Sequence, residues 1–473
     1  MLGIALPKKR IENTAMKKLI YTLLTLAFFT VSSQAQRVLS LEECIEIALA
    51  NNLDIKRARN NAVAAESNMF QSKMNWLPSL NAGANHRWNE GLDFDVTAGR
   101  LVNTTTLGGG GSLSANMTVF DGFSNMLNEK RSQYLYDAAQ ANIESNIQSI
   151  EVRVVAGFLD VISTRESLKI AEQTKGLLQD QLDREEKRER AGVGNMEQVY
   201  NFRSQVAQQD LNIVNVRNRL ETSQLTLIQL LLLDPTEDIT FGGVTSTDAE
   251  LELEIDTYAS VFDKAMSYSP GVKSAEFSLK ASNQALKAAK NYWMPSVSVS
   301  ASYGTGWSSN RINVLERDSN TGEILRTEVL DLTEQFKDNV SKSATMSLSI
   351  PIFNRFRNSN QVQQSKIQML NSELGLEQAK NTLTNNVQQA YLNLVNAKTS
   401  YAAAKESLLN LNTAYEFAKN RYENGTIDFV TYLQSLNGKN NGELQLARAK
   451  YSILFRQFIL DIFTGELEMN NPN

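Results

Sequence analysis

Residues 296–303 read Ser-Val-Ser-Val-Ser-Ala-Ser-Tyr, and residues 343–350 read Ser-Ala-Thr-Met-Ser-Leu-Ser-Ile. In both stretches apolar side chains alternate with small polar ones, which is typical of a β-strand with one apolar and one polar face. A weaker form of the same alternation occurs at residues 80–88 and 112–119. The sequence therefore predicts four strands, at about 79–88, 112–120, 296–304 and 343–353.

Motifs beside these strands show that the chain is one unit written twice. Leu77-Pro78-Ser79-Leu80 precedes the first strand, and Met294-Pro295-Ser296-Val297 precedes the third at an offset of 217 residues. Phe120-Asp121-Gly122-Phe123 follows the second strand, and Phe353-Asn354-Arg355-Phe356 follows the fourth at an offset of 233. We expect a first repeat at 36–240, a linker at 241–255 and a second repeat at 256–473.

The two offsets differ by 16 residues, which indicates an insertion in the second repeat between residues 303 and 345. Loops absorb insertions more easily than regular elements do. We therefore expect the polar segment 304–342 to be a loop, and also its counterpart 89–111, which contains four consecutive glycines at 108–111. Those glycines are not a phosphate-binding loop, because no Lys-Ser or Lys-Thr follows them.

Helices are expected on both sides of each strand pair. One helix of about 30 residues should run from Leu41 to about Asn75, and its counterpart from Asp256 to about Tyr292. From Ser124 to Arg190 the chain runs for 67 residues without a proline, and a helix of that length is about 100 Å long. Apolar residues recur there at alternating steps of three and four with occasional gaps, as in a coiled-coil seam, at Ile143, Ile147, Ile150, Val154, Val161, Leu168, Ala171, Leu178 and Leu182.

The chain can reverse at the end of each long helix. Ala191-Gly192-Val193-Gly194-Asn195 combines glycines that stop a helix with an asparagine that starts one, and Gln198 follows Asn195 as in a capping box. Asn424-Gly425-Thr426 repeats this turn in the second copy. The sequence therefore predicts two long helical hairpins, at 124–232 and 357–464.

The N-terminal residues resemble an export signal. Met16-Lys17-Lys18, the apolar run 19–31 and Ser33-Gln34-Ala35 are the three sections of a secretory signal peptide, with cleavage expected after Ala35. Residues 1–15 are then either an upstream extension, with Met16 as the true start, or a longer charged region. The alternative, a membrane anchor, is disfavoured because the apolar run is shorter than the roughly 20 residues of a span. Cys44 follows two glutamates, so we expect it to pack inside a helix rather than to carry lipid.

Composition excludes most chemistry. With 42% hydrophobic and 21% charged residues the chain is typical of folded proteins. One cysteine and one histidine exclude disulfide frameworks and multi-cysteine metal sites, and we expect His86 to be an ordinary strand residue rather than a ligand. No catalytic, cofactor or metal site can be assembled. Removal of residues 1–35 changes the formal charge from −5 to −9, because five basic residues and one acid leave, and so acidic a chain is unsuited to bind nucleic acid.

Strands of about nine residues, bordered by aromatic residues such as Trp88, Trp293 and Trp307, suit an outer-membrane barrel that faces lipid outside and water inside. Four strands cannot close a barrel, and known barrels begin at eight strands. Two chains supply eight strands and three supply twelve. Either assembly pairs the strand edges that lipid cannot hydrogen-bond.

The order of these segments, the duplicated Pro-Ser motifs, the Phe-Asp-Gly-Phe and Phe-Asn-Arg-Phe motifs and the glycine turns resemble the TolC-type outer-membrane efflux family over the whole mature chain. The resemblance implies a mainly α chain that forms a homotrimer in the outer membrane of a Gram-negative bacterium. Its 12-stranded β-barrel would continue into an α-helical barrel across the periplasm. The tip would dock a periplasmic adaptor and an inner-membrane transporter of RND or ABC type, and the duct would conduct small molecules passively.

By this resemblance Gly192, Val193, Gly194, Gly425 and Thr426 form the adaptor-docking tip, and Tyr422 matches a tyrosine that helps to close the gate. The chain departs from the family pattern elsewhere. Gln198 stands in place of an aspartate that faces this tyrosine, Ile427 in place of an arginine, and Thr431 and Gln434 in place of the entrance aspartates. Asp428 lies three residues before Thr431, on nearly the same helix face, and is a candidate replacement carboxylate.

Several alternatives stay open. The charged run 183–190 is either a solvated helix end with mutual ion pairs or part of the docking surface. An enzyme would need a polar cluster that one His and one Cys do not supply, and a fibrous adhesin would not need four alternating strands. Within the duct class, efflux of drugs and toxic compounds competes with type I protein secretion.

Overall fold

The structure of the protein is a computed structural model, and it describes residues 37–95, 99–242 and 255–466. The expected signal peptide at 1–35 and most of the expected linker at 241–255 lie outside the described residues. The described chain divides into two compact units. One comprises residues 37–50, 154–242 and 401–452, and the other 51–153, 255–400 and 453–466. The expectation of a mainly helical chain with a sheet part is confirmed.

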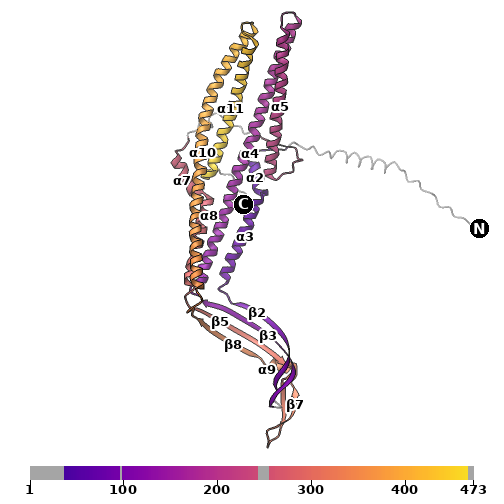
Figure 1. The fold of residues 1–473 in the computed structure, drawn as a ribbon, viewed down its shortest axis with the longest axis vertical. Coiled ribbons are helices and arrows are strands. Elements are labelled where there is room, and N and C mark those ends of the chain that lie inside the picture. The colour runs from indigo at the N-terminus through magenta and orange to yellow at the C-terminus, as the bar shows by residue number, and fades with distance from the viewer. Residues whose placement is uncertain (1–36, 96–98, 243–254, 467–473) are drawn as a thin grey trace, which may run out of the picture. The chain divides into compact units, whose positions relative to one another are not determined.

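The sheet belongs to the second of these units. It contains β2 (Ser79–Asp95), β3 (Arg100–Phe120), β5 (Ser296–Ser308) and β8 (Ser341–Ser349), all antiparallel and in the order β2-β3-β5-β8, and the four strands lie side by side in Figure 1. Val297 pairs with Leu348 and Val299 with Met346, so the apolar side chains of neighbouring strands share one face. Within this sheet β2 and β8 are the two edges.

The prediction of loops at 89–111 and 304–342 is wrong. β2 and β3 pair without interruption from Ser79 and Asn116 to Asp95 and Arg100. The four glycines at 108–111 lie in β3, where neighbouring backbones approach closely. A Cβ added at Gly109 would lie 2.6 Å from the carbonyl oxygen of Asn85, so a larger residue does not fit there.

The insertion of the second repeat is also regular. It forms the hairpin β6 (Ile312–Arg317) and β7 (Ile324–Val329), followed by α9 (Leu332–Asp338). α9 covers the edge of β5 beyond the end of β8. The buried Gln335 accepts a hydrogen bond from the Ser308 amide at 2.9 Å, and Thr305 donates its hydroxyl to the Phe336 carbonyl at 2.6 Å. The bond to Gln335 satisfies the Ser308 amide, a backbone group of β5 that an open edge leaves unpaired.

The helix expected before each strand pair is in fact two helices. The first pair is α2 (Leu41–Asn51) and α3 (Leu53–Met74), and the second is α7 (Tyr258–Tyr268) and α8 (Pro270–Asn291). Asn52 accepts hydrogen bonds from the amides of Asp54 and Ile55, at 2.8 and 3.2 Å, and so caps a new helix. Ser269 caps α8 in the same way, and Pro270 follows it at the first helical position.

The longest elements are four helices (Figure 1): α4 (Ser124–Arg190), α5 (Met196–Leu231), α10 (Arg357–Glu423) and α11 (Phe429–Thr464). Val154, Phe158 and Val161 on the α4 seam are fully buried, which is the packing that the seam pattern predicts. Among the described helices, none combines the length and the hydropathy needed to cross a membrane.

Two short parallel strands, β1 (Arg37–Leu39) and β4 (Ile239–Phe241), pair in the unit that comprises residues 37–50, 154–242 and 401–452. Cys44 on α2 is fully buried, as expected. Burial raises the pKa of its thiol to about 12, with the charges of Glu43 and Glu42 adding to the shift. Cys44 is therefore a packing residue and a poor nucleophile.

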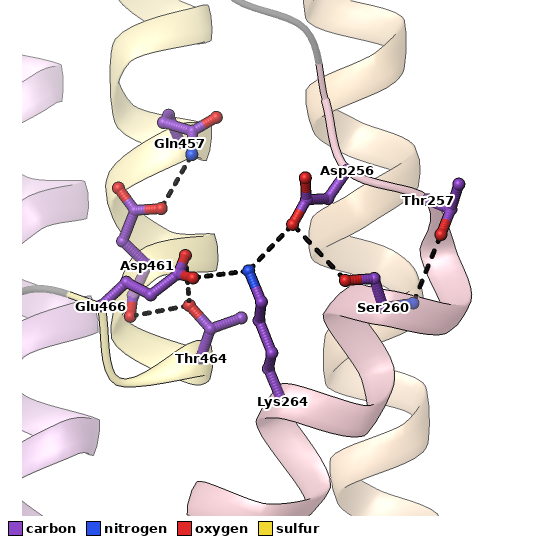
Figure 2. Close-up of polar contacts among 8 residues, drawn as sticks. All are labelled: Asp256, Thr257, Ser260, Lys264, Gln457, Asp461, Thr464 and Glu466. Carbon is purple, nitrogen blue, oxygen red and sulfur yellow. Dashed lines mark hydrogen bonds and ion pairs between the residues drawn. The ribbon is translucent and has the colours of Figure 1, made fainter.

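A polar network joins α7 and the residues just before it to the end of α11 (Figure 2). The Lys264 ammonium lies 2.9 Å from Asp256 Oδ2 and 2.7 Å from Glu466 Oε1. The hydrogen bond and the charge of Lys264 lower the pKa of Asp256. Beside it, burial raises the pKa of Asp461, which accepts from Gln457 at 2.7 Å. The three ion-pairing side chains are exposed, so the network orients these segments more than it stabilises them.

Candidate functional site

The turns that end α4 and α10 have the same geometry. Gly192 and Gly425 are left-handed, with φ of 74° and 73°, a conformation that glycine adopts without strain. The Val193 amide donates to the Arg188 carbonyl at 3.0 Å, and the Thr426 amide donates to that of Arg421 at 2.8 Å. This is the Schellman ending of a helix. It leaves Val193 and Thr426 exposed at the turns.

Capping residues then begin the returning helices. The side chain of Asn195 accepts from the Glu197 amide at 2.9 Å, and that of Asp428 accepts from the Thr431 amide at 2.9 Å. The hydrogen bonds with Thr431 lower the pKa of Asp428, whose carboxylate is exposed. Asp428 is therefore a helix cap, and its role as an entrance carboxylate stays a prediction.

An apolar cluster beneath the turns, which we call the tip core, joins the two hairpins. Its side chains come from α4, α5, α10 and α11: Leu178, Leu182, Val199, Phe202, Tyr415, Tyr422, Phe429, Tyr432 and Leu436. Phe202 meets Phe429 edge-on with ring centroids 4.5 Å apart, and Tyr422 stacks on Tyr432 at 4.8 Å. Because all four long helices contribute to the tip core, separation of the two hairpins here would expose apolar surface to water.

A carboxylate is buried at the border of the tip core. The Glu185 side chain is 3% exposed. Its Oε1 accepts from the Tyr422 hydroxyl at 3.3 Å and lies 3.4 Å from Arg188 Nη1. Its Oε2 has no partner among the residues that the structure describes. Burial and the charge of Glu185 raise the pKa of Tyr422, so Tyr422 remains protonated and keeps donating.

The burial of Glu185 is not among the expectations from the sequence, which are that the run 183–190 is a solvated helix end or part of the docking surface. A signal was present, because Leu178, Leu182 and Glu185 continue the seam at steps of four and three. A charged residue at a seam position predicts a buried charge. Other members of the run do form surface ion pairs, such as Arg184 with Glu423 at 3.3 Å and Arg203 with Glu186 at 2.8 Å.

The predicted gate residues are only partly brought together. The Tyr422 hydroxyl bonds to Glu185 rather than to Gln198, which is half-buried at the start of α5. Ile427 packs against the tip core. Thr431 and Gln434 are exposed, one turn apart on α11. A role for Gln198, Thr431 or Gln434 in gating stays a prediction.

Comparisons with known proteins agree with this architecture. The family model described as "Outer membrane efflux protein" matches residues 44–231 and 261–465. The chain is 21% identical to outer membrane protein TolC of Escherichia coli K12, across 96% of this chain and 87% of TolC. It is 20% identical to toxin and drug export protein A of Aggregatibacter actinomycetemcomitans, across 88% and 83% of the two chains. The crystal structure of the outer membrane protein VceC from Vibrio cholerae superposes with a TM-score of 0.74, at 14% identity, over 90% of this chain and 96% of that one.

The buried pair of Glu185 and Tyr422 can be tested by a double-mutant cycle. Tyr422→Phe removes a donor from a buried carboxylate, so it should lower the free energy of unfolding by about 1–3 kcal/mol. Adding Glu185→Leu replaces the carboxylate with an apolar side chain of similar size, and most of the loss should be recovered. The measurement is unfolding in detergent. Tyr200→Phe at an exposed position is the matched control, and additive losses in the double variant would contradict the pairing.

Proposed function

The chain belongs to the outer membrane efflux protein family, and we propose that it is the exit duct of a tripartite efflux system in a Gram-negative outer membrane. It conducts small molecules such as drugs and toxic compounds to the exterior, and it performs no chemistry itself. A periplasmic adaptor and an inner-membrane transporter of RND or ABC type deliver the cargo and supply the energy. The family match to both repeats is the observation that carries this proposal.

The exposed apolar side chains of the sheet support the proposal that the sheet lies in the membrane. On the outer edge strand β8, Met346 is 74% and Leu348 63% exposed on the same face, and a row of exposed apolar side chains is unfavourable in water. A protomer has two free edges, β2 and β8, which cannot stay unpaired in hydrocarbon. Three copies joined head to tail, with β8 of one beside β2 of the next, form a closed barrel of twelve strands. In this assembly the helical hairpins continue the duct into the periplasm.

The two repeats have separate parts in the proposal. Residues 36–240 and 256–473 each supply two barrel strands and one hairpin, and 241–255 links them. The tip residues Gly192, Val193, Gly194, Gly425 and Thr426 dock the adaptor. The exposed side chain of Val193 and the matching geometry of the two turns support this assignment.

The alternative is the outer-membrane channel of a type I protein secretion system. The printed name of one relative, toxin and drug export protein A, covers both classes of cargo for that protein. The tip geometry suits either system, because both need a docked periplasmic partner. The identity of the adaptor is therefore the property that distinguishes them.

Photo-crosslinking tests the docking and the cargo class together. A photoreactive residue at position 193, in cells where the duct is active, should capture a periplasmic adaptor that mass spectrometry identifies. An adaptor of a drug-efflux system supports the proposal, and one from a protein-secretion system favours the alternative. A reactive residue at the exposed Asn60 of α3 is the control. Failure to capture any periplasmic protein from position 193 would contradict tip docking.

Single-channel recording tests the gate. Tyr422→Ala, Gln198→Ala and Glu185→Ala should each raise the conductance of the purified protein in planar bilayers, because each removes a side chain that holds or lines the closed tip. Tyr422→Ala should have the largest effect, since it removes both a ring from the tip core and the bond to Glu185. Asn60→Ala should leave conductance unchanged. Unaltered conductance in the Tyr422 and Gln198 variants would remove both from the gate.

A further inference from the structure

The segment after β8, residues 350–357, carries exposed apolar and cationic side chains together, and we name it the anchor turn. We propose that the anchor turn binds anionic phospholipid headgroups in the periplasmic leaflet of the outer membrane. This inference rests on the proposed function, which places the sheet in that membrane. Its basis is the exposure, the backbone conformation and the charge of the turn.

Apolar exposure continues from the strand into the turn. Met346 and Leu348 lie on one face of β8. Ile350 and Ile352, directly after the strand, continue their period of two in the sequence and are 57% and 89% exposed. The rings of Phe353 and Phe356, each 71% exposed, meet edge-on with centroids 5.8 Å apart. The turn therefore extends the apolar face of β8 and ends it with two aromatic rings. Aromatic side chains at the end of an apolar strand face are typical of the border between hydrocarbon and headgroups.

The backbone of the anchor turn is strained. Arg355 and Phe356 are left-handed, with φ of 56° and 59°, which residues with a Cβ rarely adopt. In the first repeat the same two positions are Gly122 and Phe123, with φ of 67° and 66°. Glycine is required there, because an added Cβ would lie 2.7 Å from the Met294 Cβ. The second repeat thus keeps an arginine where glycine is the unstrained choice, and strained residues of this kind cluster at functional sites.

The two arginines of the turn form no ion pair within the described part of the chain. Arg355 and Arg357 are exposed, and neither side chain forms an ion pair with any residue that the structure describes. The first repeat has Gly122 and Ser124 at these positions, so the cations are particular to the second repeat. Two unpaired guanidinium groups beside two aromatic rings are complementary to a surface of anionic headgroups.

The anchor turn is continuous with the apolar face of β8, and this continuity favours a lipid surface over a protein partner. The apolar residues of the turn extend a strand face that the proposed barrel turns toward hydrocarbon. The arginines come at its end, where a tilted strand leaves the hydrocarbon for the headgroup layer. Long cationic side chains at this depth keep their stems in apolar surroundings and their charges at the phosphates.

The test uses the full chain with Cys44→Ser and Ile350→Cys, labelled with a fluorophore and reconstituted in phosphatidylcholine vesicles. Nitroxide-labelled phosphatidylglycerol is compared with nitroxide-labelled phosphatidylcholine as the quencher. We expect the labelled phosphatidylglycerol to be enriched at position 350 by about fivefold or more at low salt. Arg355→Gly with Arg357→Ser should reduce this ratio to about one without loss of folding, because glycine relieves the strain at 355.

Two controls make the result decisive. Arg317→Ser with Arg326→Gly removes the same number of charges from β6 and β7 and should leave the ratio unchanged. A probe at Met346→Cys reports whether the strand face is in lipid at all. Equal quenching by both lipids at position 350, a ratio that the 355/357 variant does not alter, or competition by inorganic phosphate at constant ionic strength would overturn the inference. Absence of quenching at position 346 would instead contradict the proposed barrel.

Discussion

Unpaired backbone at the two edges of a four-stranded sheet is the constraint on which the rest of this molecule depends. In water the edges of β2 and β8 can bond to solvent, but the exposed apolar residues of β8 indicate a lipid environment in which they cannot. One chain has too few strands to close a barrel. The proposed ring of three copies removes every edge at once.

The tip shows a different balance, between stability and the ability to open. Nine apolar residues from four helices hold the hairpins together, yet Glu185 lies at the border of this cluster, and one of its oxygens has no partner within the described ranges of the chain. A leucine at this seam position would pack without that cost. A buried polar contact is directional, so it fixes the register of the two hairpins and weakens sharply when they shift. We regard this as the physical reason for a carboxylate, rather than an aliphatic residue, beside Tyr422.

Much of the fold could be predicted because its patterns are local. The alternation at 296–303 and the seam of α4 are visible in the sequence without knowledge of the neighbouring segments. The strands and the long helices could therefore be predicted. The extensions of β2 and β3 could not be predicted, because a run of glycines in a sequence is typical of a loop. The structure gives the reason for these glycines: a Cβ added at Gly109 would lie 2.6 Å from the backbone of a neighbouring strand. The breaks at Asn52 and Ser269 depend on single caps inside otherwise helical stretches. At the site, Tyr422 was named by family resemblance, but its partner Glu185 depends on how two hairpins pack, and the repeat boundaries stay predictions.

Edge pairing between copies closes the proposed barrel, and the native mass of the purified protein in detergent tests this pairing most directly. We expect a single species with the mass of three chains, together with slow hydrogen exchange of the backbone amides on the outer edges of β2 and β8. A folded monomer whose β2 and β8 edge amides exchange rapidly would contradict it.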